Sequence, residues 1–314
     1  NDLSSEIIKE FPELQGLMAA KYLLNQYGDI KSAIAVYEHY LPKFKGDILP
    51  TSIEGALLSI SERIELLISI FIIGKRPSGS SDPYALRRAA NGIIQIIIFH
   101  RLNINLVDLI INLLNNWNSL IDKFSLDKNV LANDLYDLLI QRSISYFEDN
   151  NYDQDIIKSV FYNNDINLSN LSDLLDSKLK IDLITILRRD SRLIEIQSII
   201  SRVSRLAEKG GLDISEISSY KLVDKSLFEK DSESKLLDII DQIYPILISK
   251  ENIRYSNIID IIEKSSSAFC EFFDGANSVM VMTDDPKVRE NRLNLLGLIR
   301  NQMLNIADFS KIII

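Results

Sequence analysis

Residues 76–97, RPSGSSDPYALRRAANGIIQII, join a loop to the start of a helix within one short window. Proline, glycine and serine fill its first part, and this composition predicts a loop. Asp82 followed by Pro83 predicts a helix start, because aspartate caps a helix N-terminus and proline already has the φ of a first helical residue. We therefore predict a helix that runs from Pro83 to about Arg101.

Helical patterns lie on both sides of this window. Apolar residues recur at helical spacing over residues 53–73, and Gly74 follows as a stop. Upstream, two helices are predicted over residues 12–28 and 31–42. Downstream, residues 102–179 are typical of shorter amphipathic helices separated by turns rich in asparagine and aspartate.

The last part of the chain is also predicted to be helical. One long helix is expected over residues 186–209, where the apolar residues share one arc of a helical wheel. Three further helices are predicted over residues 232–249, 254–273 and 285–305. The last of them begins at a second Asp–Pro dipeptide, formed by Asp285 and Pro286.

The composition agrees with an all-α fold. The chain has 314 residues, of which 46% are hydrophobic and 25% charged, and these values are ordinary for globular proteins. With 11 Gly and 7 Pro, residues that break helices are few. A chain of this length can form two or three packed units. The first residue is Asn1 rather than Met, so we expect the sequence to be the C-terminal part of a longer protein.

Two features limit the compartment in which the protein works. The single cysteine, Cys270, excludes an internal disulfide and fits a reducing compartment. It is predicted to be a buried thiol, because its neighbours are apolar. The longest apolar run, residues 66–73, is far shorter than the roughly 20 residues of a membrane-spanning helix, so we expect no membrane span.

The sequence lacks the patterns of three catalytic chemistries. An HD-type metal phosphohydrolase needs several histidine and aspartate ligands, but the chain has only His39 and His100, and neither precedes an aspartate. Both histidines are therefore expected to be structural or exposed. A P-loop needs G-x-x-x-x-G-K-[ST] after a strand, which residues 76–83 do not provide. The G-x-S-x-G pattern of a serine nucleophile is absent as well.

Two clusters of basic residues contrast with the net charge of −9. The first basic cluster consists of Lys75, Arg76, Arg87 and Arg88, with Asp82 as the one acidic residue among them. The second basic cluster consists of Arg188, Arg189, Arg192, Arg202, Arg205 and Lys209. Such clusters bind phosphate groups of nucleic acids, or they form solvated helix faces with internal salt bridges. The residues alone leave both interpretations open.

Four stretches of the sequence resemble a known family. They are residues 2–22, DLSSEIIKEFPELQGLMAAKY, residues 38–50, EHYLPKFKGDILP, residues 74–97, GKRPSGSSDPYALRRAANGIIQII, and residues 272–310, FFDGANSVMVMTDDPKVRENRLNLLGLIRNQMLNIADFS. In this order and at this spacing they resemble the C-terminal half of the β subunit of the bacterial-type tetrameric glycyl-tRNA synthetase.

The resemblance implies a fold and a division into domains. It implies a degenerate HD-like helical domain over residues 1–101, truncated at its N-terminus, a helical connecting body over 102–179, and a DALR-like anticodon-binding helical bundle over 180–314. The sequence departs from the family at residues 61–67, where SERIELL replaces the usual A-D-K-x-D-T-L. Tyr84 also replaces a phenylalanine that is usual in the family.

The resemblance further implies a subunit of a glycine–tRNA ligase in which the α subunit binds ATP and Mg and activates glycine. This chain is then expected to carry no catalytic residue, metal ligand or cofactor, and to position tRNA(Gly) for aminoacylation. The implied partners are tRNA(Gly) and the α subunit, or a fused α region, in an α2β2 heterotetramer without membrane contact. The implied compartment is the cytoplasm, with the plastid stroma as an alternative.

The resemblance also implies which residues contact tRNA. On the acceptor side they are Lys75, Arg76, Arg87 and Arg88. On the anticodon side they are Arg202, Arg205, Lys209, Arg289, Arg292 and Arg300. Phe309 is a candidate for stacking on a base. Two other functions remain alternatives, namely an HD-type metal phosphohydrolase and an acidic helical interaction scaffold.

Overall fold

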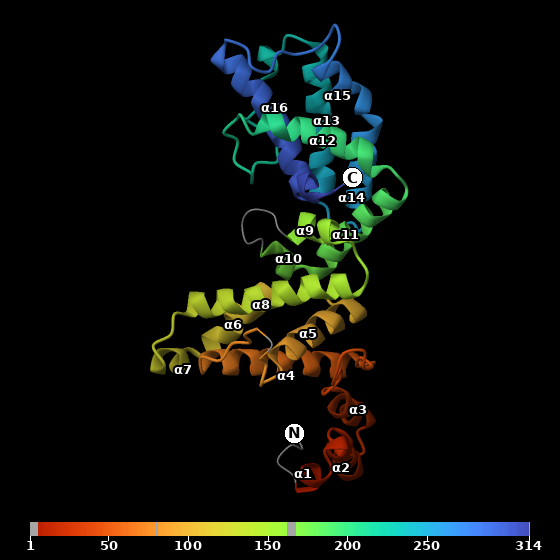
Figure 1. Cartoon of the computed structure of the whole chain (residues 1–314), viewed down its shortest axis with the longest axis vertical. Coiled ribbons are helices and arrows are strands. Elements are labelled where there is room, and N and C mark those ends of the chain that lie inside the picture. Colours follow the sequence, from red (N-terminus) through yellow and green to blue (C-terminus); the bar gives the residue numbers. More distant parts are fainter. Residues whose placement is uncertain (1–5, 80, 162–167, 314) are drawn as a thin grey trace. The chain divides into compact units, whose positions relative to one another are not determined.

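The computed structural model describes residues 6–79, 81–161 and 168–313. Within these ranges the chain forms α-helices, short 3-10 helices and connecting turns, and no β-strand (Figure 1). The all-α prediction is confirmed. The chain divides into two compact units, the first comprising Asn1–Asn151 and Leu168–Asp176 and the second comprising Tyr152–Asn167 and Ser177–Ile314. The division into three domains stays a prediction.

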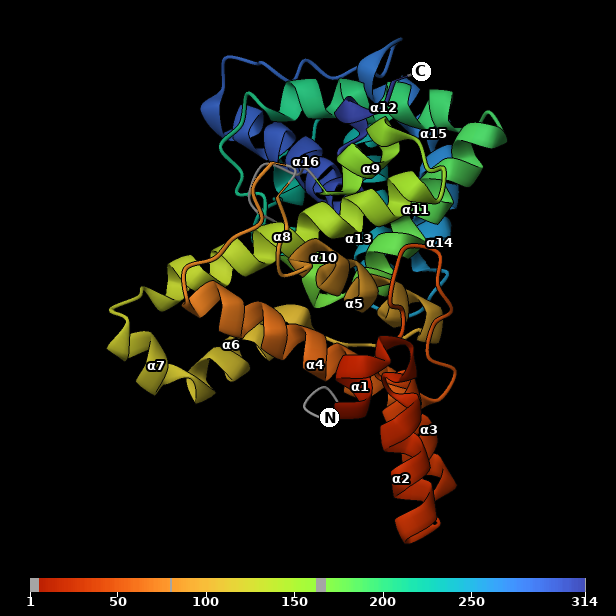
Figure 2. The ribbon, with the colours of Figure 1, turned by 60° about the horizontal axis from the view of Figure 1, so that its bottom comes forward.

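The first unit consists of a helical hairpin followed by a larger group of helices. The hairpin comprises α1 (Glu6–Glu10), η2 (Pro12–Leu14), α2 (Leu17–Tyr27) and α3 (Ile30–Glu38). The larger group comprises α4 (Ile53–Ile72), α5 (Leu86–His100), α6 (Leu106–Asn116), α7 (Asn118–Lys123), α8 (Lys128–Asp149) and α10 (Ser169–Ser172). In this group α5 packs against both α4 and α8 (Figure 2).

The core of the first unit is built on the apolar face of α5. Ile93, Ile94, Ile96 and Ile97 are fully buried there, as is Ile68 of α4. Burial of such a side chain contributes about 1.5–3 kcal/mol to stability. This burial fixes which side of α5 faces solvent, and with it the position of the polar residues on that helix.

The start of α5 differs from the sequence prediction. The Asp82 carboxylate does cap the helix, since it accepts hydrogen bonds from the backbone N–H groups of Leu86 at 2.7 Å and Arg87 at 3.0 Å. The helix nevertheless begins at Leu86 rather than Pro83, because Ala85 adopts a left-handed conformation with a φ of 54°. Pro83 therefore lies in the turn before the helix.

Arg63 of α4 fixes the loop that joins α3 to α4. It is 9% exposed and donates hydrogen bonds to the backbone carbonyls of His39 at 3.1 Å, Tyr40 at 3.2 Å and Pro42 at 3.0 Å. Burial lowers the pKa of Arg63 to about 10. Gly92 of α5 makes room for this side chain, because a Cβ atom there would lie 2.6 Å from the Arg63 Nε atom.

The second unit is a helical bundle. It contains α9 (Gln154–Phe161), most of α11 (Leu174–Arg189), α12 (Leu193–Ala207), η3 (Lys225–Leu227), α13 (Asp231–Leu247), α14 (Arg254–Lys264), α15 (Ser266–Phe273), α16 (Pro286–Leu304) and η4 (Phe309–Lys311). Helix α16 packs against both α12 and α13. Leu295, Leu296 and Ile299 of α16 are fully buried, so this helix carries much of the core of the unit.

Three predictions for the second unit were wrong in detail. The single helix expected over residues 186–209 is divided into α11 and α12, because Ser191 adopts a left-handed φ of 60° between them. The helix expected over residues 254–273 is divided at Ser265 into α14 and α15. Cys270 is exposed rather than buried, because it lies on the solvent side of α15.

Candidate nucleic-acid interface

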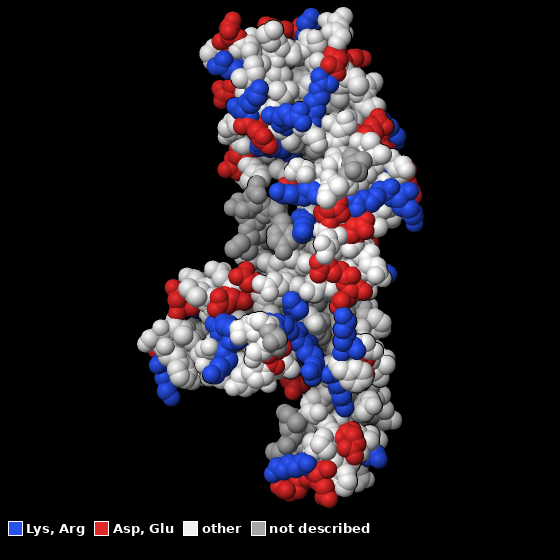
Figure 3. All heavy atoms as spheres, in the orientation of Figure 1, with Lys and Arg blue, Asp and Glu red and all other residues white. Residues whose placement is uncertain are grey.

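The first basic cluster is divided between two places in the first unit. Arg76 follows α4 and is held internally, because its Nε donates to the Asp134 carboxylate at 2.9 Å and its guanidinium lies over the Phe71 ring at 4.0 Å. Lys75 is exposed beside it. The other two residues of the cluster, Arg87 and Arg88, lie on α5. Figure 3 shows Lys and Arg side chains gathered on one face of this unit, over α4 and α5.

Arg87 and Arg88 of α5 line a hollow of about 520 Å³ in the first unit. Its walls come from residues 42–46, the turn before α5, α5 itself and the C-terminal end of α8. Its other polar lining residues are Lys45, Asp82, Asn91, Gln95, Tyr146, Asp149 and Asn150. Arg88 is exposed, and its one side-chain hydrogen bond to a described residue, the Lys43 carbonyl, is long at 3.5 Å. No side-chain hydrogen bond or ion pair joins Arg87 to another residue of the described ranges. The hollow is therefore lined by arginines that keep donors for a ligand.

Arg142 of α8 is a third arginine near this hollow, and sequence reasoning missed it. It is half-buried, and its Nε has no hydrogen-bond partner among the described residues. Burial and, after it, the positive charge of Arg87 lower the pKa of Arg142. The charge of Arg87 reaches Arg142 only because α8 packs against α5. No pattern in the sequence around Arg142 could have indicated this proximity.

Three arginines of the second basic cluster are held by carboxylates. The ion pairs join Arg188 to Asp153 and Asp155, Arg189 to Asp190, and Arg192 to Asp260 and Glu263. The hydrogen bonds of Arg188 to Asp155 are the largest of the effects that raise the pKa of this arginine. For these three side chains the structure supports the salt-bridge interpretation.

Arg202 of α12 is also paired, although it is exposed. Its guanidinium donates to both oxygens of the Asp274 carboxylate, at 2.5 and 2.8 Å, and lies over the Phe273 ring at 4.4 Å. The hydrogen bonds to Asp274 raise the pKa of Arg202. The positive charge of Arg202 is therefore partly neutralised by a neighbour on the surface.

Four further basic residues that are predicted to contact tRNA line two hollows of the second unit. Arg205 and Arg300 line a hollow of about 660 Å³, and Lys209 and Arg289 line one of about 560 Å³. Arg205 and Lys209 are exposed, and neither makes a side-chain ion pair within the described residues. Arg289 and Arg300 each donate a hydrogen bond to a backbone carbonyl at 3.1 Å. These four side chains keep part of their donor capacity.

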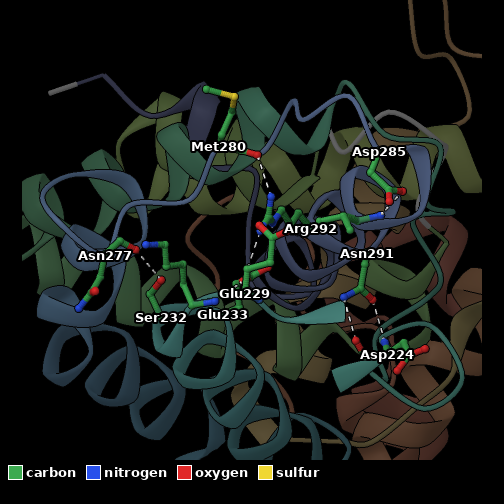
Figure 4. Close-up of polar contacts among 11 residues, drawn as sticks. Asp224, Glu229, Ser232, Glu233, Asn277, Met280, Asp285, Asn291 and Arg292 are labelled. Atoms are coloured by element: carbon green, nitrogen blue, oxygen red, sulfur yellow. Dashed lines mark hydrogen bonds and ion pairs between the residues drawn. The ribbon is translucent and has the colours of Figure 1, made fainter. Parts of the chain in front are cut away.

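Arg292 of α16 lies in the core, unlike the other arginines predicted to contact tRNA. It is 2% exposed, and Figure 4 shows it beside Glu229 and Glu233, which it contacts at 2.7 and 2.8 Å. It also donates to the Met280 carbonyl at 3.1 Å. Burial lowers the pKa of Arg292, but the hydrogen bonds to both glutamates and their negative charges together outweigh burial and raise it. A guanidinium with these partners presents no face to a phosphate, so we remove Arg292 from the predicted tRNA-contacting set.

Other predicted side chains also have internal positions. Phe309 is 2% exposed, which contradicts its prediction as a stacking surface. The His39 Nδ1 atom lies 2.5 Å from the Val36 carbonyl oxygen, and the His100 Nε2 atom lies 2.7 Å from that of Pro50. In the part of the chain that the structure describes, no group of three or more His, Cys, Asp or Glu could hold a metal ion. This geometry gives no support to the phosphohydrolase alternative.

None of the helices that the structure describes combines the length and the apolar character that a membrane crossing requires. The fold and the site together thus define a class, an all-helical protein whose candidate interface presents arginine and lysine side chains. Residues 1–162 match the family model described as Glycyl-tRNA synthetase beta subunit. The chain belongs to this family, and the resemblance seen in the sequence is confirmed.

Three relatives, each named Glycine–tRNA ligase beta subunit, illustrate the relationship. The proteins of Trichodesmium erythraeum and Gloeothece citriformis are 37% and 36% identical over 316 residues. Each match covers 99% of this chain and 44% of the relative. The protein of Clostridioides difficile is 33% identical over 99% of this chain and 42% of its own length. The chain therefore spans less than half the length of these relatives.

Proposed function

We propose that this chain is a tRNA-binding, non-catalytic portion of a glycyl-tRNA synthetase β subunit. In the proposed reaction, ATP, glycine and tRNA(Gly) give glycyl-tRNA, AMP and pyrophosphate. The α subunit, or a fused α region, would supply the site for ATP, Mg and glycine. We also propose an α2β2 assembly in the cytoplasm, since the relatives give no support for the plastid stroma.

The proposal rests on two arginines of α5 in a chain that belongs to this family. Arg87 and Arg88 line a hollow, and no carboxylate among the described residues forms an ion pair with either of them. When arginines contact backbone phosphates, counterions are released from the RNA, and this release supplies much of the free energy with which a protein binds RNA. An RNA held in one orientation reacts with a lower barrier, because orientational entropy has already been lost.

The residues proposed to contact tRNA follow from their exposure and partners. On the acceptor side they are Lys75, Arg87 and Arg88, and on the anticodon side they are Arg202, Arg205, Lys209, Arg289 and Arg300. Arg76 and Arg292 are held by internal carboxylates and have structural roles in this proposal. The chain would therefore position tRNA through side chains that are spread over both units.

The test is a charge reversal of both α5 arginines, Arg87→Glu with Arg88→Glu, in the complete synthetase. We expect tRNA affinity in filter binding to fall at least about tenfold, because two attractive phosphate contacts become repulsive. Glycine-dependent ATP–pyrophosphate exchange should remain near the wild-type rate, because that half-reaction requires no tRNA.

A matched control changes the same amount of charge elsewhere in the same unit. Lys21→Glu with Lys31→Glu serves this purpose, because both lysines are exposed, on α2 and α3. This control should bind tRNA nearly as well as the wild type. Equal tRNA affinity of the arginine variant and the wild type would overturn the proposal and favour an acidic interaction scaffold.

A further inference from the structure

Helix α3 turns an apolar stripe towards solvent. Ile30, Ile34 and Tyr37 follow one another at positions i, i+4 and i+7, which places them on one side of the helix, and we call them the α3 stripe. Their exposed fractions are 63%, 42% and 43%. The buried residues of α3 are instead two alanines and a glutamate, namely Ala33, Ala35 and Glu38. Such a stripe normally faces a core, so α3 lacks the partner that its pattern predicts among the described residues.

The neighbouring helix α2 adds little core to this hairpin. It packs against α3 (Figure 2), yet Ala20 is the one buried residue among its 11 residues, all of which the structure describes. Tyr22, Leu24 and Tyr27 of the same helix are exposed. Isolated helices shorter than about 12–15 residues are marginal in water. The hairpin is therefore stabilised only weakly by its own contacts.

Exposed apolar residues are concentrated in this part of the chain. More than half of the large apolar and aromatic side chains that are exposed in the described ranges lie within residues 7–73, which make up less than a quarter of the chain. Soluble proteins normally scatter such side chains singly, whereas a gathered set marks an interaction surface. The α3 stripe is the part of this set that helical spacing places on one face.

The charges of the hairpin do not fit an RNA backbone. The α3 stripe contains no charged residue, and the exposed charged residues within 17–38 are Lys21, Asp29 and Lys31. The Asp29 carboxylate caps α3, since it accepts hydrogen bonds from the backbone N–H groups of Lys31 at 3.1 Å and Ser32 at 3.3 Å. Phosphates are bound by clustered arginine and lysine. The stripe therefore fits an apolar protein surface better than a nucleic acid.

The length of the relatives indicates which protein surface this is. Matches that cover 99% of this chain cover only 44% of the related β subunits. More than half of such a subunit therefore lies outside the matched residues and is covalently joined to them. A segment of the same polypeptide reaches the stripe at a high effective concentration, without the entropy cost of bringing two molecules together.

We propose that the α3 stripe is an intramolecular docking surface for an apolar segment of the same β subunit, from the part that this chain does not span. The segment packs on Ile30, Ile34 and Tyr37 and removes them from water. Because α3 also packs against α4, the contact joins the first unit to the rest of the subunit. The docking needs no tRNA contact and thus goes beyond the function proposed above.

A photo-crosslinking residue identifies what covers the stripe. Tyr37→p-benzoylphenylalanine, introduced into the complete synthetase, keeps an aromatic ring on the stripe and adds a ketone that captures neighbouring C–H bonds on illumination. We expect mass spectrometry to find a crosslinked peptide from the part of the β subunit outside this chain. Assembly from a mixture of light and heavy isotope-labelled β subunits shows whether one copy or two are involved, because only a crosslink between copies joins a light peptide to a heavy one.

Every other product of this experiment would overturn the docking. These products are a crosslink to a second β subunit, to the α subunit or to tRNA, and the absence of any crosslink has the same meaning. Tyr220→p-benzoylphenylalanine is the control, because Tyr220 is an exposed residue of a turn in the second unit. It should not capture the segment that position 37 captures.

Glutamine substitutions distinguish a covered stripe from one that faces solvent. If the stripe faces solvent, Ile30→Gln with Ile34→Gln should not destabilise α3, because glutamine has a slightly better helix propensity than isoleucine. If it is covered, the backbone amides of α3 and of the crosslinked segment should exchange hydrogen at least about tenfold faster than in the wild-type synthetase, because the contact protects both partners. Unchanged exchange, or faster exchange in the hairpin alone, would overturn the docking.

Lys31→Gln is the matched control on the same helix. Lys31 is exposed and lies about 100° from Ile30 around the helix axis, outside the stripe, so its replacement should leave exchange in α3 unchanged. Exchange as fast as in the double isoleucine variant would show that α3 opens after any change, and would overturn the docking. The tRNA affinity of Arg87→Glu with Arg88→Glu is independent of these results, so the docking and the proposed function can fail separately.

Discussion

The same Asp–Pro dipeptide lies at the start of α16 and shortly before α5, yet the two helices start differently. In α16, Pro286 is the first helical residue and Asp285 is the cap. In α5, Asp82 also caps the helix, but the helix begins only at Leu86. Ala85, which lies between these two residues, adopts a left-handed conformation. The dipeptide therefore marks the cap of a helix, and the local backbone decides where the helix begins.

The arginines of these two helices differ in a more important way. Arg292 of α16 is buried against Glu229 and Glu233 (Figure 4), whereas Arg87 of α5 lines a hollow and forms no ion pair with a carboxylate of the described residues. A paired and buried arginine has its donors occupied within the fold and depends on its partner, whereas an unpaired one beside a hollow keeps its donors for a ligand. The partners within reach, rather than the residue type, decide the role of each arginine.

The largest loss of stability should come from removing Glu233, the buried partner of Arg292. Glu233 is fully buried, and its carboxylate accepts from the Arg292 Nε at 2.8 Å. Glu233→Ala leaves a buried charge without its main partner, which typically costs 3–5 kcal/mol, so we expect a loss of about 3–5 kcal/mol in the free energy of unfolding of the second unit. Urea denaturation followed by circular dichroism measures this loss.

The control for this change is the other glutamate that contacts Arg292. The side chain of Glu229 is 64% exposed, so Glu229→Ala should cost less than about 1 kcal/mol. Equal losses in the two variants would show that burial of the ion pair is not what makes α16 differ from α5.

A smaller loss of stability should follow the replacement of either of two glycines, one on α5 and one on α16, that allow close packing of these helices. A Cβ atom at Gly92 of α5 would lie 2.6 Å from the Arg63 Nε, and Arg63 is held in place by several hydrogen bonds. A Cβ atom at Gly297 of α16 would lie 2.8 Å from the Leu212 Cδ2, which belongs to a flexible side chain on a loop. We expect Gly92→Ala to cost about 1–3 kcal/mol and Gly297→Ala less, by thermal denaturation.

Gly211→Ala is the matched control, because no atom lies within 4 Å of a Cβ atom built there. Its stability should be within about 0.5 kcal/mol of the wild type. Gly92→Ala should also weaken tRNA binding, because Arg63 anchors one wall of the hollow through the Pro42 carbonyl. A stable Gly92→Ala protein with wild-type affinity would contradict the role given to Arg63.

The sequence predicts the helices of this fold well, because apolar residues recur at helical spacing and capping residues mark several helix starts. It does not predict the breaks at Ala85 and Ser191, where non-glycine residues adopt a positive φ. The site is less predictable for a different reason, which is the packing of distant helices. Arg292 and Glu233 are 59 positions apart in the chain, so their pairing depends on how helices pack. The effect of the Arg87 charge on Arg142 depends in the same way on the packing of α8 against α5.

The smallest predicted effect concerns Arg202, which is exposed like Arg88 but paired like Arg292. Asp274→Asn removes the negative partner and leaves the guanidinium available to solvent. If pairing lowers the availability of an arginine for phosphate, tRNA affinity in low salt should rise about twofold in this variant. Arg202→Gln in the Asp274→Asn background should abolish the gain, and a persistent gain would show that the lost negative charge acts at a distance.

The pH dependence of this pair provides a second measurement of the same contact. The hydrogen bonds from Arg202 lower the pKa of Asp274 below its usual value of 3.8. Because the folded-state pKa is the lower one, the pair stabilises the fold above about pH 4, and this contribution is lost as the pH falls through the folded-state pKa. The melting temperatures of wild type and Asp274→Asn should therefore differ slightly at pH 7 and converge below pH 4. A difference in melting temperature that stays constant from pH 7 to pH 3 would show that the exposed ion pair does not stabilise the fold. The Asp274 carboxylate would then act only by occupying the donors of Arg202.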